Sequence, residues 1–411
     1  MKRSHSCSSL ASPVKQQKPY HHNTSLTFDA LKEHNKETPR LSPFARFEMA
    51  PEGSSTLSDI PIIPPPSTRS SHRTRSSSPS RISDAQYRGG HLRRANIFVD
   101  DEVPTDISTY LNERVFYDLI SDDSKLRTIS DKLWSKSKEL VRKPSGEAEW
   151  TEALHMAIDE LRFKGLEIVR NRDWRGDLKP PIHNPQPNIP RKRSQLHETI
   201  QHSSTQPSEI PELRSPLPTI PVFKLKDPRP DICVGLSDES IITALEPRKG
   251  LNAARSFLLD LQDTSSLISD PHVTPLGLRF PFLIVEAKAG ATGGNLYQAQ
   301  NQAAVSGSTA LQILKNMSDL NQGSREGIEE GNEREQEFNL KLAFSVITEG
   351  PIHELWLHFR TSNEDFCMAC VGAWRTTLKD GSMDLLRHLF AVLRWGDGEF
   401  RNTIVGTLQL V

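Results

Sequence analysis

The chain has 411 residues, enough for two or three average domains, but 29 of them are proline and only 35% are hydrophobic. The formal net charge is −1 and the mean hydropathy is −0.53, which indicates that part of the chain does not build a core. The longest apolar run is interrupted by charge after five residues, which predicts no membrane span. The N-terminus lacks the apolar region of a secretory signal, and four cysteines do not suggest a disulfide framework. We therefore expect an intracellular protein of the nucleus or cytoplasm that is not secreted.

Residues 1 to about 100 are predicted to be a disordered tail that is rich in Ser, Pro and Arg, because no apolar period is sustained there. Residues 1–94 carry 15 Lys and Arg against 7 Asp and Glu, whereas the remainder carries 36 of the 51 basic and 45 of the 52 acidic residues. If nucleic acid is a partner, this tail would supply non-specific attraction to phosphates. A solvated tail with no ligand is the alternative.

Helical spacing of apolar residues begins near residue 105. The segments STYLNERVFYDLI and SKLRTISDKLWSKSKELVRK predict two helices, and a third is predicted from Glu147 to about Arg170. Acidic side chains at Glu147 and Glu149 favour the positive N-terminal end of this third helix. Its buried face is predicted to contain Trp150, Leu154, Ala157 and Leu161.

A polar, Pro-rich stretch over about residues 176–220 is predicted to be a flexible insertion, because a loop of this length is uncommon inside a compact domain. It contains PRKRS, a weak candidate for nuclear import. Strand patterns follow at VFKL (222–225), DICVGL (231–236) and RFPFLIVEAKA (279–289).

The last part of the chain alternates between helix and strand patterns. A Gly-rich turn, AGATGGN, leads into a predicted helix over 295–317, and two strands form a predicted hairpin around Glu349–Gly350. A further strand pattern, FCMACVGAWRT, precedes an amphipathic helix that Ser382 would cap and Gly396 would close. This order predicts one α/β domain over residues 105–411, with a mixed central sheet flanked by helices.

Charged side chains stand at the ends of two of the apolar strands. Asp231 begins one of them, and Glu286 and Lys288 end the other on the same face, because strand side chains alternate. A carboxylate and an ammonium on an apolar strand are costly unless they are used, although a partly buried ion pair is the simpler explanation. Two carboxylates, with the backbone carbonyl of Ala287, would suit Mg²⁺ or Mn²⁺, and Lys288 would orient the attacking water. These residue types predict metal-dependent phosphodiester cleavage.

The segments RPDICVGL, PFLIVEAKA and NLYQAQNQAAVSG resemble the PD-(D/E)XK nuclease-like domain found widely in fungal proteins, part of the restriction-endonuclease-like superfamily. The resemblance implies that Asp231 matches the motif's Asp, Glu286 its Glu and Lys288 its Lys, on adjacent strands of a small mixed sheet. It also implies that Gln298 or Gln302, which share one helical face, matches the glutamine of the following helix. The implied activity is Mg²⁺-dependent hydrolysis of nucleic acid.

Two assignments in this resemblance stay open. The segment GEAEWTEALH resembles the leading helix of the family, in which Glu149 or Glu152 would approach the metal. Glu286 lies 55 residues after Asp231, far more than a simple hairpin needs, so Asp238 and Asp260 are alternatives for the motif's Asp. Members of the family are not all active. A catalytically inactive binding or scaffold module is therefore the alternative function.

Overall fold

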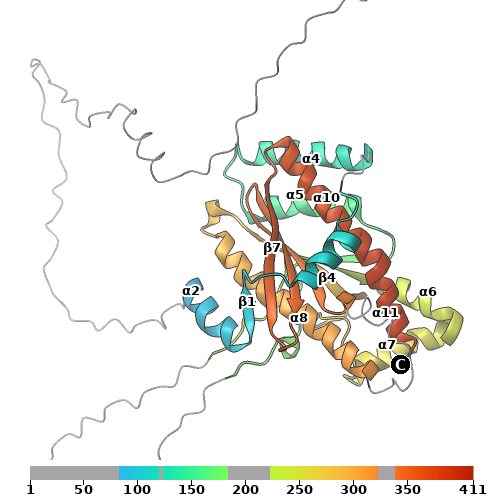
Figure 1. Cartoon of the computed structure of the whole chain (residues 1–411). Coiled ribbons are helices and arrows are strands. Elements are labelled where there is room, and N and C mark those ends of the chain that lie inside the picture. The colour runs from blue at the N-terminus through green and yellow to red at the C-terminus, as the bar shows by residue number, and fades with distance from the viewer. Residues whose placement is uncertain (1–82, 120–123, 184–222, 323–337, 411) are drawn as a thin grey trace, which may run out of the picture. The chain divides into compact units, whose positions relative to one another are not determined.

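Seven strands form one mixed sheet in the computed structural model, which describes residues 83–119, 124–183, 223–322 and 338–410, all within the unit Ser77–Val411 (Figure 1). The strands are β1 (Ile97–Val99), β2 (Leu166–Arg170), β3 (Ile232–Ser237), β4 (Leu278–Lys288), β5 (Leu342–Glu349), β6 (Ile352–Arg360) and β7 (Phe366–Arg375). Their order in the sheet is β1-β7-β6-β5-β4-β3-β2. β1 runs parallel to β7 and β4 runs parallel to β5, whereas the other neighbours are antiparallel.

Helices and single helical turns connect and cover these strands. They are α2 (Asp84–Gln86), η1 (Tyr87–Leu92), α3 (Thr105–Tyr110), η2 (Leu111–Val115), α4 (Ser124–Leu140), α5 (Glu147–Leu161), η3 (Gly176–Leu178), α6 (Asp238–Lys249), α7 (Leu251–Asp263), η4 (Gly290–Thr292), α8 (Leu296–Gln322), α10 (Lys379–Trp395), η5 (Gly396–Phe400) and α11 (Arg401–Leu408). α2 and β1 lie at one side of the sheet, and α6 and α7 lie at the other (Figure 1).

α8 is the long helix that connects the parallel strands β4 and β5, and it packs across most of the sheet. Its approach to β6 is close, because a Cβ atom added at Gly307 would lie 2.2 Å from Nδ1 of His358. The ring of His358 is buried and its Nε2 atom lies 2.8 Å from Oγ of Ser345. Glycine at position 307 therefore lets helix and sheet meet at this point.

α4, α5 and α10 pack together as a second helical layer. The predicted buried face of α5 is confirmed, since the side chains of Trp150, Leu154, Ala157 and Leu161 are all buried. Both faces of the central strand β4 are therefore covered, and every residue from Leu278 to Ala287 is buried. The predicted fold class, an α/β protein with a mixed central sheet flanked by helices, is confirmed.

Several local predictions were wrong. The third helix ends at Leu161 rather than near Arg170, because the chain turns at Gly165 and its next residues form β2. Residues 223–225 of the VFKL segment form no strand, and Val222 lies outside the described part. The chain passes beside η1 here, where the Lys226 amide donates to the Tyr87 hydroxyl at 2.9 Å.

α10 also differs from its prediction at both ends. It begins before Ser382, whose hydroxyl donates to the Ser130 carbonyl at 3.0 Å instead of capping the helix. It does not close at Gly396, because η5 and α11 continue the chain.

The last part of the predicted N-terminal tail is folded. Residues 83–99, assigned to the tail from the sequence, form α2, η1 and β1. Residues 1–82 lie outside the described part, as do residues 184–222, which include most of the predicted insertion and the PRKRS cluster.

β1 pairs with only Phe366–Met368 at one edge of the sheet, so the rest of the β7 edge has no strand partner among the described residues.

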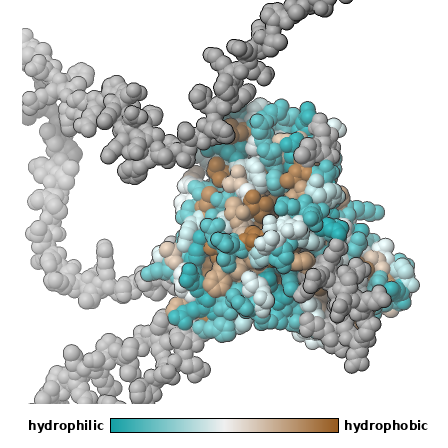
Figure 2. Space-filling view, viewed as in Figure 1, coloured by the Kyte–Doolittle hydropathy of each residue, from teal (hydrophilic) through white to brown (hydrophobic). Residues whose placement is uncertain are grey.

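Figure 2 shows apolar side chains gathered near the centre of this view, amid a largely hydrophilic surface. In the described ranges, no helix combines the length and the apolar character that crossing a membrane requires.

Candidate functional site

Asp231 and Glu286 lie next to each other at the ends of two paired antiparallel strands. Asp231 immediately precedes β3, whose first residue, Ile232, is paired with Val285 of β4. The Asp231 amide donates to the Val285 carbonyl at 3.0 Å, and the Ala287 amide donates to Oδ2 of Asp231 at 2.7 Å. These bonds place the Asp231 carboxylate beside the chain segment that carries Glu286.

The Glu286 carboxyl group is enclosed between the sheet and α8. Only 2% of this residue is exposed, and the Ser306 hydroxyl donates to its Oε1 atom at 3.0 Å. Burial raises the pKa of Glu286 well above its usual value, and the charge of Asp231 raises it further. Burial also raises the pKa of Asp231, against the effect of the hydrogen bond from Ala287. Each of the two neighbouring acids is therefore easier to protonate in the folded protein than in water.

Lys288 adds a cation to this pair of acids. Its Nζ atom lies 3.3 Å from Oε1 of Glu147 at the start of α5, and it donates to the Ala287 carbonyl at 2.5 Å. The Lys288 side chain is 12% exposed, and Gly294 packs directly against it: a Cβ atom there would lie 2.9 Å from the Lys288 Cβ. The Lys288 ammonium thus lies between the start of α5 and the end of β4.

The acid contributed by α5 is neither of the two expected from the sequence. Glu149 accepts a hydrogen bond from the Gly146 amide at 2.9 Å and so closes the N-terminus of its own helix. Glu152 forms an ion pair with Arg170 at 2.7 Å. Glu147 is the residue that reaches Lys288, and its signal in the sequence was only its position as the first residue of the helix.

Both predicted glutamines of α8 line a cavity with Glu286. This cavity has a volume of about 80 Å³, and Gln298, Gln302 and Ser306 form its α8 side. The Oε1 atom of Gln302 is buried and has no hydrogen-bond partner within the described residues. A buried polar atom without a partner is costly, so it marks a position where a ligand or water would gain a hydrogen bond.

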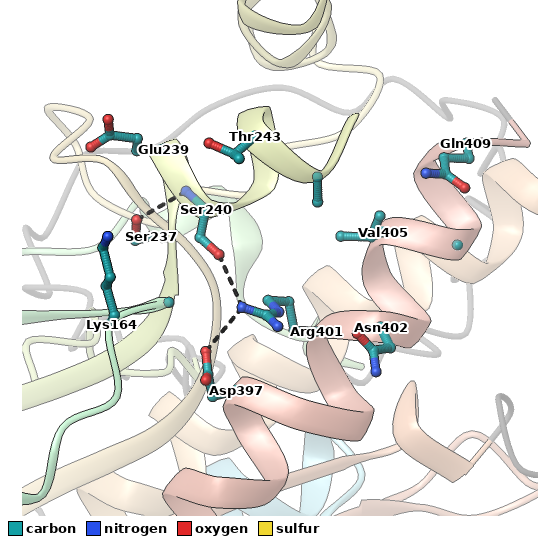
Figure 3. A pocket seen from close by; sticks show the side chains of 13 residues that line it. Lys164, Ser237, Glu239, Ser240, Thr243, Asp397, Arg401, Asn402, Val405 and Gln409 are labelled. Carbon is teal, nitrogen blue, oxygen red and sulfur yellow. Dashed lines mark hydrogen bonds and ion pairs between the residues drawn. The ribbon is translucent and has the colours of Figure 1, made fainter. Parts of the chain in front are cut away.

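The alternative acids lie elsewhere. Asp238 begins α6 and forms an ion pair with Arg279 at 2.8 Å, and Asp260 lies on α7. A larger pocket of about 600 Å³ lies near Asp238, between α6, α11 and residues 164–165 (Figure 3).

This larger pocket contains an ion pair of its own. Figure 3 shows Arg401 between Asp397, at 3.2 Å, and the Ser240 hydroxyl, at 3.5 Å. The pocket lies where β3 ends at Ser237. At the usual rise of a strand, Ser237 is roughly 20 Å from Asp231. The pocket is therefore separate from the site at Glu286.

The oxygen atoms at the Asp231 site suit a hard divalent cation. Mg²⁺ is commonly held by one or two carboxylates, with water and substrate oxygens completing its shell. Asp231 and Glu286 supply two carboxylates, and the Ala287 carbonyl lies beside them and accepts from Lys288. No group of three His, Cys, Asp or Glu side chains arranged to hold a metal occurs in the described segments. The chain's own residues thus fit Mg²⁺ or Mn²⁺ only as a site with two carboxylates.

These features define an α/β protein with two acids, a lysine and a glutamine-bearing helix at the end of two antiparallel central strands. The chain belongs to the family described as "Domain of unknown function (DUF7924)", whose model matches residues 177–404, more than half of the chain. The match includes Asp231, Glu286, Lys288 and α8, but it excludes Glu147. No curated protein and no solved structure matched the chain.

Proposed function

We propose that the protein is a PD-(D/E)XK nuclease-like enzyme that hydrolyses phosphodiester bonds of nucleic acid with Mg²⁺ or Mn²⁺. The observation that carries this proposal is the convergence of Asp231, Glu286 and Lys288 at one end of β3 and β4. The cavity lined by Glu286, Gln298 and Gln302 adds polar groups beside them. An Asp and a Glu-x-Lys on adjacent strands, followed by a glutamine-bearing helix, is the arrangement that the resemblance implies.

Each residue has a role in this reaction. Hydrolysis forms a bond between a water oxygen and phosphorus and breaks a P–O ester bond; the water loses one proton and the leaving oxygen gains one. A bound Mg²⁺ would lower the pKa of the water and offset charge on the phosphate. Asp231, Glu286 and the Ala287 carbonyl would hold the cation, and Lys288 would orient the water. Glu147 would hold the ammonium in place.

The direct test is incubation of the purified chain with plasmid, single-stranded DNA and RNA, with Mg²⁺, with Mn²⁺ and with EDTA. We expect cleavage only with a divalent cation, and loss of cleavage in Lys288→Ala. Lys136→Ala is the matched control, because Lys136 is an exposed lysine on α4 that pairs with Glu139. Cleavage that survives Lys288→Ala, or that persists in EDTA, would refute the assignment.

A second candidate is a nuclease-like fold without catalysis that acts as a binding or scaffold module. It is favoured by the deep burial of Glu286 and by a site with only two carboxylates in the described ranges. Calorimetric titration with Mg²⁺ separates the two functions. A folded protein that takes up no Mg²⁺ at a pH where Glu286 is ionised supports the scaffold, whereas uptake that Glu286→Gln abolishes supports the enzyme.

A further inference from the structure

Two segments far apart in the sequence lie side by side next to the cavity at Glu286. The His91 ring contacts the Lys224 carbonyl through Nδ1 at 2.8 Å, and the Lys226 amide donates to the Tyr87 hydroxyl at 2.9 Å. The Arg94 guanidinium stacks over the Phe223 ring at 4.1 Å. Residues 87–94 and 223–229 therefore form one continuous surface.

This surface is rich in cations. Five of its basic side chains, which we call the basic strip, are Arg93, Arg94, Lys224, Lys226 and Arg229. Of these, only Arg229 has an ion pair with a carboxylate among the described residues, at 3.5 Å from Asp173. Asp227, the one acid within the 223–229 segment, is already paired with Lys179. Unneutralised cations are thus concentrated here, although residues 95–411 carry more acids than bases.

The strip is continuous with the candidate site. Tyr87, Lys226, Pro228 and Arg229 line the same cavity as Glu286. A polyanion that contacts Lys226 and Arg229 would therefore lie beside this cavity. Exposed lysines and arginines attract phosphates through long-range charge, and each phosphate contact releases counterions.

We propose that the basic strip binds the phosphodiester backbone of a nucleic acid and guides it to the cavity at Glu286. This inference builds on the proposed function, because it identifies the surface that would hold the substrate of that site. An anionic membrane and an acidic peptide are the competing polyanions. Nucleic acid is favoured because the strip ends at acids and a lysine suited to phosphodiester chemistry, for which neither competitor offers a substrate.

The test measures binding of short labelled single-stranded DNA, RNA and duplex DNA to the full chain in EDTA. Fluorescence anisotropy reports the binding over a range of salt concentrations. We expect Lys224→Glu/Lys226→Glu to weaken binding at low salt by at least about tenfold. Loss of two phosphate contacts should reduce the slope of log K against log salt by about 1.4 for single strands and about 1.8 for duplex DNA.

Matched controls separate this effect from general charge and from misfolding. Lys136→Glu/Lys138→Glu makes the same charge change at the same spacing on the exposed surface of α4 and should leave binding unchanged. Lys224→Gln/Lys226→Gln removes the charges with less perturbation and should give a smaller loss in the same direction. Thermal unfolding verifies that each variant folds.

The outcomes distinguish this inference from the proposed function. Strip-dependent binding in EDTA, together with no cleavage in Mg²⁺, supports the strip and refutes the nuclease. Cleavage that is unchanged in the strip variants, or binding equal in the strip and control variants, refutes the strip alone. Strip-dependent binding to phosphatidylserine vesicles or to polyglutamate, with none to nucleic acid, also overturns the proposal.

Discussion

The protonation of Glu286 makes the stability of the protein depend on pH in a defined direction. Burial and the neighbouring Asp231 raise the pKa of Glu286 above the ordinary value of 4.5, whereas Lys288 and the Ser306 hydroxyl oppose this rise. Between the ordinary and the raised pKa, the folded protein holds a proton that the unfolded chain has released. The stabilisation is complete below the ordinary pKa and is lost as the pH rises through the raised value.

The size of this effect follows from the single proton involved. In that window the free energy of unfolding falls by up to about 1.4 kcal/mol for each unit of pH, since one proton is bound in the folded state and none in the unfolded state. Glu286→Gln removes the proton but keeps an oxygen that accepts from Ser306. Asp231 titrates in both proteins, so its contribution largely cancels. The variant should therefore gain stability relative to wild type as the pH rises.

Urea unfolding in EDTA at several values between about pH 5 and pH 8 measures this difference. The control is Glu139→Gln, because the pKa of the exposed Glu139 is lowered by Lys143 and Lys136 and its removal should give no gain with rising pH. Adding Mg²⁺ at the alkaline end should stabilise wild type and not Glu286→Gln, since a bound cation displaces the proton. A difference between wild type and Glu286→Gln that stays flat across this range would refute the reasoning.

Three further substitutions test the surroundings of the site. Ser306→Ala should destabilise the fold by about 1–3 kcal/mol in urea unfolding, because it leaves a buried oxygen of Glu286 without its donor. Gly294→Ala places a Cβ atom 2.9 Å from Lys288, so we expect a loss of about 1–3 kcal/mol and a larger proportional loss of cleavage in the plasmid assay. Glu149→Ala should cost about 0.5–1 kcal/mol by removing the helix cap and should leave kcat unchanged, which would contradict a metal-binding role.

The sequence was most informative where an apolar run ends in charged side chains. The long apolar run of β4 required a central strand, and the charged end of that run located Glu286 and Lys288. The spacing of Gln298 and Gln302 by one helical turn placed both on the cavity side of α8.

Other elements carried signals that were weaker or depended on tertiary contacts. α6 contains Pro247 and has few apolar residues at helical spacing, so no helix was predicted there. β2 follows α5 so closely that its Ile168 and Val169 were taken as a continuation of the helix, although Gly165 marks the break. The choice among the acids of α5 depended on where that helix begins, which its capping hydrogen bond determines.

The long separation of Asp231 from Glu286 in the sequence is explained by the path of the chain. β3 carries the chain away from Asp231 to Ser237, α6 and α7 then follow, and β4 returns from Leu278. The inserted chain leaves β3 at Ser237 and enters β4 at Leu278, and both of these residues lie at the far end of the strand pair. A connection of any length at that end would bring Asp231 back beside Glu286, because antiparallel pairing fixes which residues are neighbours. The 55 residues between the two acids are therefore compatible with a shared site.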